Sequence, residues 1–335
     1  MGLISRIIER VKGARQVDLT FVKSISAQDA GIEGIGQAID RDSCYVELYL
    51  ESLRLARARK FTTKFNAVVY SFVTLSRLGK EPAQLAAVSR PVNLTELDPN
   101  SLDRIITVSK RMMGATPFRG SPMSIELGLF SVKSGSLLTP VLDYVTRVSS
   151  TAGISFVGAI KPFLPLITEG MDLIAGQAQN TELEVGVETD LSVTEGCVMA
   201  IIACPKGSID ASKLSLDKDH KLLLDGKALE KYGYAVFSLR PTPNKIDFGV
   251  IPELKERFDT FLSAISAGKQ KDAKDAREAF RLATIASPDL IPTDVKELKA
   301  LTKQMYTEAF PPGGKADFGP TELRIKSLSE IGLYD

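Results

Sequence analysis

A single histidine, His220, limits the chemistry that this chain of 335 residues can perform. Histidine is the usual proton carrier and a common metal ligand near neutral pH. With one histidine, the chain lacks most of the ligands and bases that zinc sites, di-iron sites and Ser-His-Asp triads use. His220 stands in the charged segment 217–221 between apolar stretches, a pattern that predicts an exposed hairpin turn. We expect no catalytic residue here, and an enzyme would have to use carboxylate, lysine or tyrosine chemistry.

The three cysteines, Cys44, Cys197 and Cys204, match no CxxC pattern and no disulfide framework. Cys197 and Cys204 bound a continuous apolar run, which predicts a central strand with the two thiols on opposite faces. We expect inert core thiols, no metal and no cofactor, as suits a reducing cytosol.

Two loops have the beginnings of ligand-binding motifs but lack essential positions. Residues 31–36 are rich in glycine without the GxGxxG order, and residues 40–42 start like a calcium loop in which Cys44 replaces an oxygen ligand. Residues 153–158 contain Ser155, but one residue too many separates it from the next glycine for a nucleophile elbow. We therefore predict no nucleotide, calcium or nucleophile site at these positions.

Residues 44–78 predict two long antiparallel strands joined by a basic tip. The connection carries five positive charges in eleven residues and no acidic residue among them: Arg54, Arg57, Arg59, Lys60 and Lys64. Such a tip can bind phosphate, lipid headgroups or an acidic partner. The alternative is a charged gatekeeper that keeps a long strand pair soluble.

Both ends of the chain carry apolar stripes. Residues 2–15 predict a basic amphipathic helix with Ile4, Ile7 and Ile8 on its apolar side, which can lie on an anionic bilayer, dock on a partner or cover its own core. After the breaker segment 311–314, the C-terminal arm offers Leu323 and Ile325 for docking, either on a neighbouring chain or on its own core.

The most apolar stretch, residues 153–168, is interrupted by Lys161, Pro162 and Pro165. A constitutive membrane span needs roughly 20 predominantly apolar residues. We expect a buried connector here, with conditional membrane insertion or a ligand-pocket wall as alternatives. No secretory signal is visible, so we expect a cytoplasmic protein, with peripheral attachment to a membrane left open.

The expected fold class is α+β, with antiparallel β-rich modules, a buried helical connector and a C-terminal helical module. The segments are the helix 1–15, a β-rich module 16–180 with its connector at 136–178, a second β-rich segment 181–250, helices within 251–310, and the arm 311–335. Pro252 predicts a helix start and Gly268 a stop, with further helices over 270–286 and 294–310.

A net charge of +1, from 42 basic and 41 acidic side chains, argues against a dedicated nucleic-acid binder. The leading hypothesis is a non-enzymatic intracellular assembly subunit that uses its terminal arms to bind a protein partner or itself. The alternatives are a membrane-binding protein that uses residues 2–15, the basic tip and residues 153–168, and an enzyme.

Overall fold

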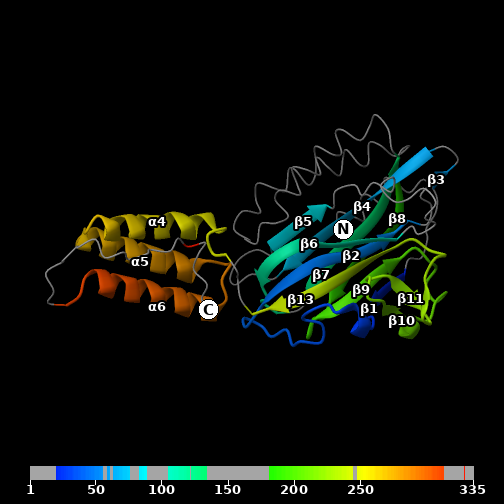
Figure 1. Ribbon diagram of the computed structural model, residues 1–335, viewed down its shortest axis with the longest axis horizontal. Helices are drawn as coiled ribbons and strands as arrows, with labels where there is room; N and C mark the ends of the chain where they lie inside the picture. Colours follow the sequence, from blue (N-terminus) through cyan, green and yellow to red (C-terminus); the bar gives the residue numbers. More distant parts are fainter. Residues whose placement is uncertain are drawn as a thin grey trace.

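The protein is an α+β molecule in which an antiparallel β-sandwich carries a module of three helices (Figure 1). The computed structural model describes residues 20–55, 59–60, 63–75, 83–88, 105–120, 122–133, 181–243, 247–312 and 328. The expected helix 2–15, the connector 136–178 and the stretch 153–168 lie outside the described residues.

Two large sheets form the sandwich, and every strand pair in them is antiparallel. The first sheet has the order β1 (Thr20–Lys23), β9 (Cys197–Ile202), β13 (Tyr234–Thr242), β2 (Tyr45–Arg54) and β6 (Ile105–Pro117). The second has the order β3 (Arg59–Lys60), β4 (Thr63–Leu75), β7 (Met123–Lys133) and β8 (Thr181–Leu191), with β5 (Ala83–Val88) also on β4. A small sheet contains β10 (Leu214–Leu216), β11 (Leu222–Leu224) and β12 (Lys227–Ala228).

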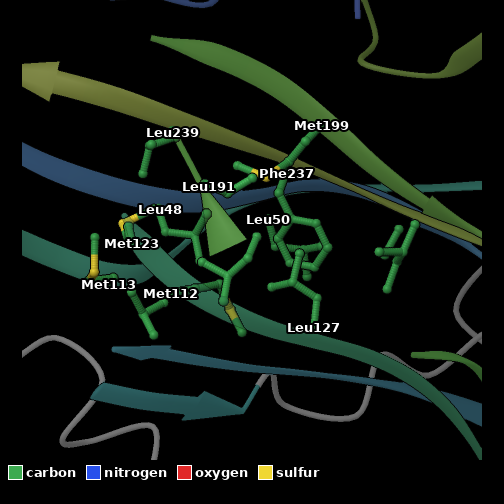
Figure 2. Packing of buried hydrophobic residues seen from close by; sticks show 14 of the residues in the cluster. Leu48, Leu50, Met112, Met113, Met123, Leu127, Leu191, Met199, Phe237 and Leu239 are labelled. Carbon is green, nitrogen blue, oxygen red and sulfur yellow. The ribbon is translucent and has the colours of Figure 1, made fainter. Parts of the chain in front are cut away.

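The main core lies between the two large sheets. Leu48 and Leu50 of β2 meet Leu127 of β7 and Phe237 of β13 there (Figure 2), because alternate residues of a strand share one face. A second apolar cluster joins the opposite face of the first sheet to the small sheet.

The three cysteines are free and buried. Cys197 belongs to the cluster between the large sheets and Cys204 to the cluster beneath the small sheet. The predicted placement of these two thiols on opposite faces is confirmed.

The two long strands predicted within residues 44–78 form, but the prediction that they pair with each other is wrong. β2 lies between β13 and β6, whereas β4 lies in the second sheet. The basic segment therefore crosses between sheets, and its tight hairpin is formed by β3 and β4, with Arg59 opposite Lys64. The alternation of apolar and polar residues shows that each strand has a buried face. It does not show which sheet the strand joins, because each of the two sheets of a sandwich buries one face of its strands.

The C-terminal module consists of α4 (Pro252–Ser266), α5 (Gln270–Ala286) and α6 (Pro292–Ala309). The predicted start at Pro252 is confirmed, and so is the stop, since Gly268 follows α4 with a left-handed φ of 67°. The rings of Phe258 and Phe280 pack with centroids 5.2 Å apart in its core. None of the described helices combines the length and apolar character that a membrane-spanning helix needs.

Candidate functional site

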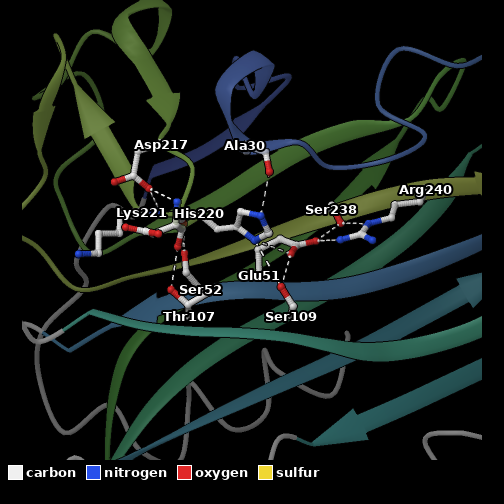
Figure 3. A network of polar contacts seen from close by, with 11 residues as sticks. Ala30, Glu51, Ser52, Thr107, Ser109, Asp217, His220, Lys221, Ser238 and Arg240 are labelled. Atoms are coloured by element: carbon white, nitrogen blue, oxygen red, sulfur yellow. Dashed lines mark hydrogen bonds and ion pairs between the residues drawn. The ribbon is translucent and has the colours of Figure 1, made fainter. Parts of the chain in front are cut away.

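The most concentrated polar cluster surrounds Glu51 in the middle of the first sheet. Leu50 lies opposite Phe237 and Ser52 opposite Val236, so Glu51 is an extra residue in β2. The pairing of β2 with β6 is irregular at the same place, where Ser109 has a φ of 39°. A β-bulge redirects side chains, and here it accompanies a carboxylate that points toward the turn after β10 (Figure 3).

Glu51 is completely buried, with an exposed fraction of 0%, and its carboxylate is surrounded by donors. Ser109 Oγ donates at 3.2 Å, and His220 Nδ1 lies 3.0 Å away. Ser238 Oγ and the Arg240 guanidinium also donate to it. Burying a carboxylate is costly unless it is paired and hydrogen-bonded, and this arrangement provides both.

His220 occupies the predicted turn between β10 and β11, in a left-handed conformation with a φ of 58°. The prediction of a solvated side chain is wrong, because the side chain is only 17% exposed. Its Nε2 lies 3.1 Å from the carbonyl oxygen of Ala30, in the short helix η1 (Gln28–Ala30). The charged neighbours of His220 indicate a turn, but they carry no signal that the turn folds against β2.

This geometry does not suit nucleophile activation. In a Ser-His-carboxylate triad the serine and the carboxylate contact opposite nitrogens of the imidazole. Here Ser109 Oγ lies 3.4 Å from Nδ1, the nitrogen that also faces Glu51, while Nε2 contacts Ala30. The cluster instead joins η1, the turn at His220 and three strands of the first sheet, which favours a structural role.

The glycine-rich segment 31–36 packs backbone against backbone. Gly36 N donates to Gly196 O at 2.8 Å, and Gly196 N donates to Gln37 O at 2.8 Å. A Cβ on Gly196 would lie 2.0 Å from the carbonyl oxygen of Gly34. In the segment 40–42 that starts like a calcium loop, Asp42 Oδ1 forms an ion pair with Arg119 Nη1 at a distance of 2.7 Å. Close chain approach, rather than phosphate binding, accounts for glycine at position 196.

The predicted basic-tip residues have different placements. Arg54 ends β2 with 5% of its surface exposed and donates from Nη1 to Tyr232 O at 3.3 Å, so the expectation that it belongs to a tip is wrong. Arg59, Lys60 and Lys64 lie in the backbone of the β3–β4 hairpin. The remaining predicted binding residues, Ile4, Ile7, Ile8, Arg57, Leu323 and Ile325, lie outside the described residues.

The strand registers of the first sheet place the start of β1 beside the end of β2. Arg54 lies opposite Tyr234, Tyr234 opposite Ile202, and Ile202 opposite Thr20. Residue 19 and the arm before it therefore connect to the sandwich at the end where β2 finishes.

The second sheet brings two further connections to the same end. Phe65 lies opposite Lys133, and Val132 opposite Thr181, so β4 begins, β7 ends and β8 begins there. β3 lies at the end of the sandwich farther from α4–α6 (Figure 1). We call this end, marked by Thr20, Arg54, Lys133 and Thr181, the β3 end.

A scan of protein-family models and searches of curated proteins and of solved structures find no match for this chain. The described residues contain no cluster of three or more His, Cys, Asp or Glu side chains that could hold a metal ion. What the structure defines is a class of architecture, a β-sandwich with a three-helix module at one end and the sequence's basic and apolar segments joined to the other.

Proposed function

We propose that this chain is a peripheral membrane-binding protein whose β3 end contacts an anionic lipid surface. The supporting observation is that three segments whose sequences suit such a surface are joined to strands that begin or end at this end of the sandwich. They are the basic amphipathic stripe in residues 2–15, the basic segment 57–64, and residues 153–168, which lie between Lys133 and Thr181.

These three segments complement one another physically. Each Lys or Arg near an anionic bilayer contributes about 1 kcal/mol of attraction, which salt screens. An amphipathic helix adds burial of its apolar face at the level of the headgroups. Stable peripheral attachment usually needs two such signals, and the sequences of the three segments supply both positive charge and apolar residues.

Assembly through the terminal arms has weaker support. Leu328 is 1% exposed and belongs to the core of the helical module. The C-terminal arm therefore packs on its own chain at this position, which leaves residues 2–15 as the stronger candidate for contact with another molecule. The Glu51 cluster gives little support to an enzyme, because its groups contact one another and the backbone.

Co-sedimentation with vesicles of phosphatidylcholine, with and without phosphatidylserine, tests the proposal. The triple variant Arg57→Glu, Arg59→Glu, Lys60→Glu should lose at least about tenfold in affinity for the anionic vesicles, because attraction becomes repulsion. Added salt should weaken binding of the unmodified protein. At every salt concentration, less of the unmodified protein should bind to vesicles of phosphatidylcholine alone than to the anionic vesicles.

The matched control reverses three exposed lysines of the helical module, Lys271, Lys274 and Lys303, with the same change in net charge. It should bind within about twofold of the unmodified protein, because the module lies away from the β3 end and screening suppresses long-range charge effects. Equal losses in both variants would indicate a response to net charge alone. Unchanged binding of the first variant at low salt would leave the basic segment only its role in solubility.

A further inference from the structure

The helical module and the sandwich have separate hydrophobic cores. The cluster that contains Phe258 and Phe280 shares no residue with the cluster between the large sheets. In the described part of the chain, a small cluster of Tyr45, Ala115 and Ile291 lies between them. Modules without a large apolar interface are expected to move relative to each other.

Polar side chains of the sandwich hold the connection between α5 and α6. The hydroxyl of Tyr45 donates to Asp294 Oδ2 and accepts from Ile291 N at 3.2 Å. Arg119 pairs with Asp42 through Nη1 and donates from Nη2 to Leu290 O at 2.6 Å. These directed contacts join the two modules around residues 288–294.

Opening of the junction would exchange these contacts for contacts with water. Asp294 is completely buried and the Arg119 side chain is 10% exposed. Opening would return both charged groups to solvent, and the recovered hydration would offset much of the lost interaction. Closed and open arrangements then differ less in free energy than they would across an apolar interface of the same size.

We propose that Tyr45 and Arg119 form a releasable latch, and that the helical module moves relative to the sandwich when the latch opens while both modules stay folded. The latch lies near Tyr45, at the opposite end of β2 from Arg54. It does not depend on membrane binding at the β3 end.

The distance between spin labels on the two modules tests the latch. Labels at Lys227→Cys on β12 and Ser266→Cys at the end of α4 occupy exposed positions, while the three native thiols are buried. The unmodified junction should give one narrow distance distribution. Tyr45→Phe, and separately Arg119→Ala, should at least double its width and add longer distances.

Tyr234→Phe is the matched control. Tyr234 is also completely buried, and its hydroxyl accepts from Leu222 N at 3.3 Å between the first sheet and the small sheet, away from the junction. This control should keep the narrow distribution. The proposal is overturned if both latch variants remain folded by circular dichroism and keep the narrow distribution. It is also overturned if both latch variants unfold the two modules together, because the junction would then belong to a common core.

Discussion

At the scale of single residues, Glu51 shows how a buried charge can organise a β-protein. Its carboxylate contacts side chains from β6, from β13 and from the turn after β10. Backbone contacts reinforce the same turn, since Ser52 Oγ donates to His220 O and Thr107 Oγ1 donates to Asp219 O at 2.7 Å. The bulge at Glu51 therefore lies where the small sheet attaches to the first large sheet.

His220→Ala should destabilise the protein by about 1–3 kcal/mol, because the substitution leaves a buried acceptor without one of its donors. The exposed turn that the sequence predicts would instead make a substitution of His220 nearly neutral for stability. Urea unfolding measures the change. Lys218→Ala, an exposed neighbour in the same turn, should stay within about 0.5 kcal/mol. Equal midpoints for the two variants would contradict the structural role of His220.

The cysteines illustrate the protective effect of burial. Desolvation raises the pKa of the Cys44 thiol and of the Cys197 thiol above their ordinary value. The thiolate is the reactive form of cysteine, so burial both shields these groups and keeps them protonated. Their burial agrees with the interpretation from the sequence that they are core thiols.

At the scale of elements, the strand ends determine where the neighbouring segments attach to the sandwich. The strands concerned are β1, β2, β4, β7 and β8. Their registers align the attachment points of three distant segments at the β3 end. A strand's own sequence determines which side chains face the core, but the position of its ends relative to other strands follows from pairing.

The N-terminal arm provides a prediction at this scale. Ile4→Glu with Ile8→Glu should abolish most binding to anionic vesicles, and any association with a partner, while the folded content measured by circular dichroism persists. Burial of each isoleucine contributes on the order of 1.5–3 kcal/mol, so Arg6→Gln with Arg10→Gln should cost less. Vesicle co-sedimentation and sedimentation velocity measure the two effects. If the isoleucine variant behaves like the unmodified protein in both assays, the arm packs only on its own chain.

At the scale of the whole molecule, the two ends of the sandwich differ in character. One end carries the helical module through Tyr45 and Arg119, and the other joins the basic and apolar segments of the sequence. A protein with this polarity can contact a surface through one end while the module at the other end stays clear of it. The proposed function and the proposed latch thus belong to separate regions.

Separate cores predict separate unfolding. Phe280→Ala removes a completely buried ring from the helical module and should cost about 3–5 kcal/mol. In calorimetry, Phe280→Ala should lower the temperature of the helical transition and leave the sandwich transition unchanged. Phe237→Ala should lower the temperature of the sandwich transition and leave the helical transition unchanged. A single transition that both substitutions lower equally would show that the modules unfold as one unit.

Local sequence patterns predict the C-terminal helices, the long strands within residues 44–78 and the strand that begins at Cys197. Pro252 and Gly268 mark a helix because caps act on neighbouring residues, and the apolar run from Cys197 to Cys204 predicts its strand because side chains alternate locally. The single histidine limits catalysis wherever it lies in the fold.

The pairing of the strands and the direction of the His220 side chain depend on contacts between residues that are far apart in the sequence. Glu51 and His220 are separated by 169 positions in the sequence, and no local pattern records that a turn folds onto a bulge. β2 and β4 each have an apolar face that either sheet could bury. The choice between sheets, and with it the alignment at the β3 end, depends on the simultaneous packing of all the strands.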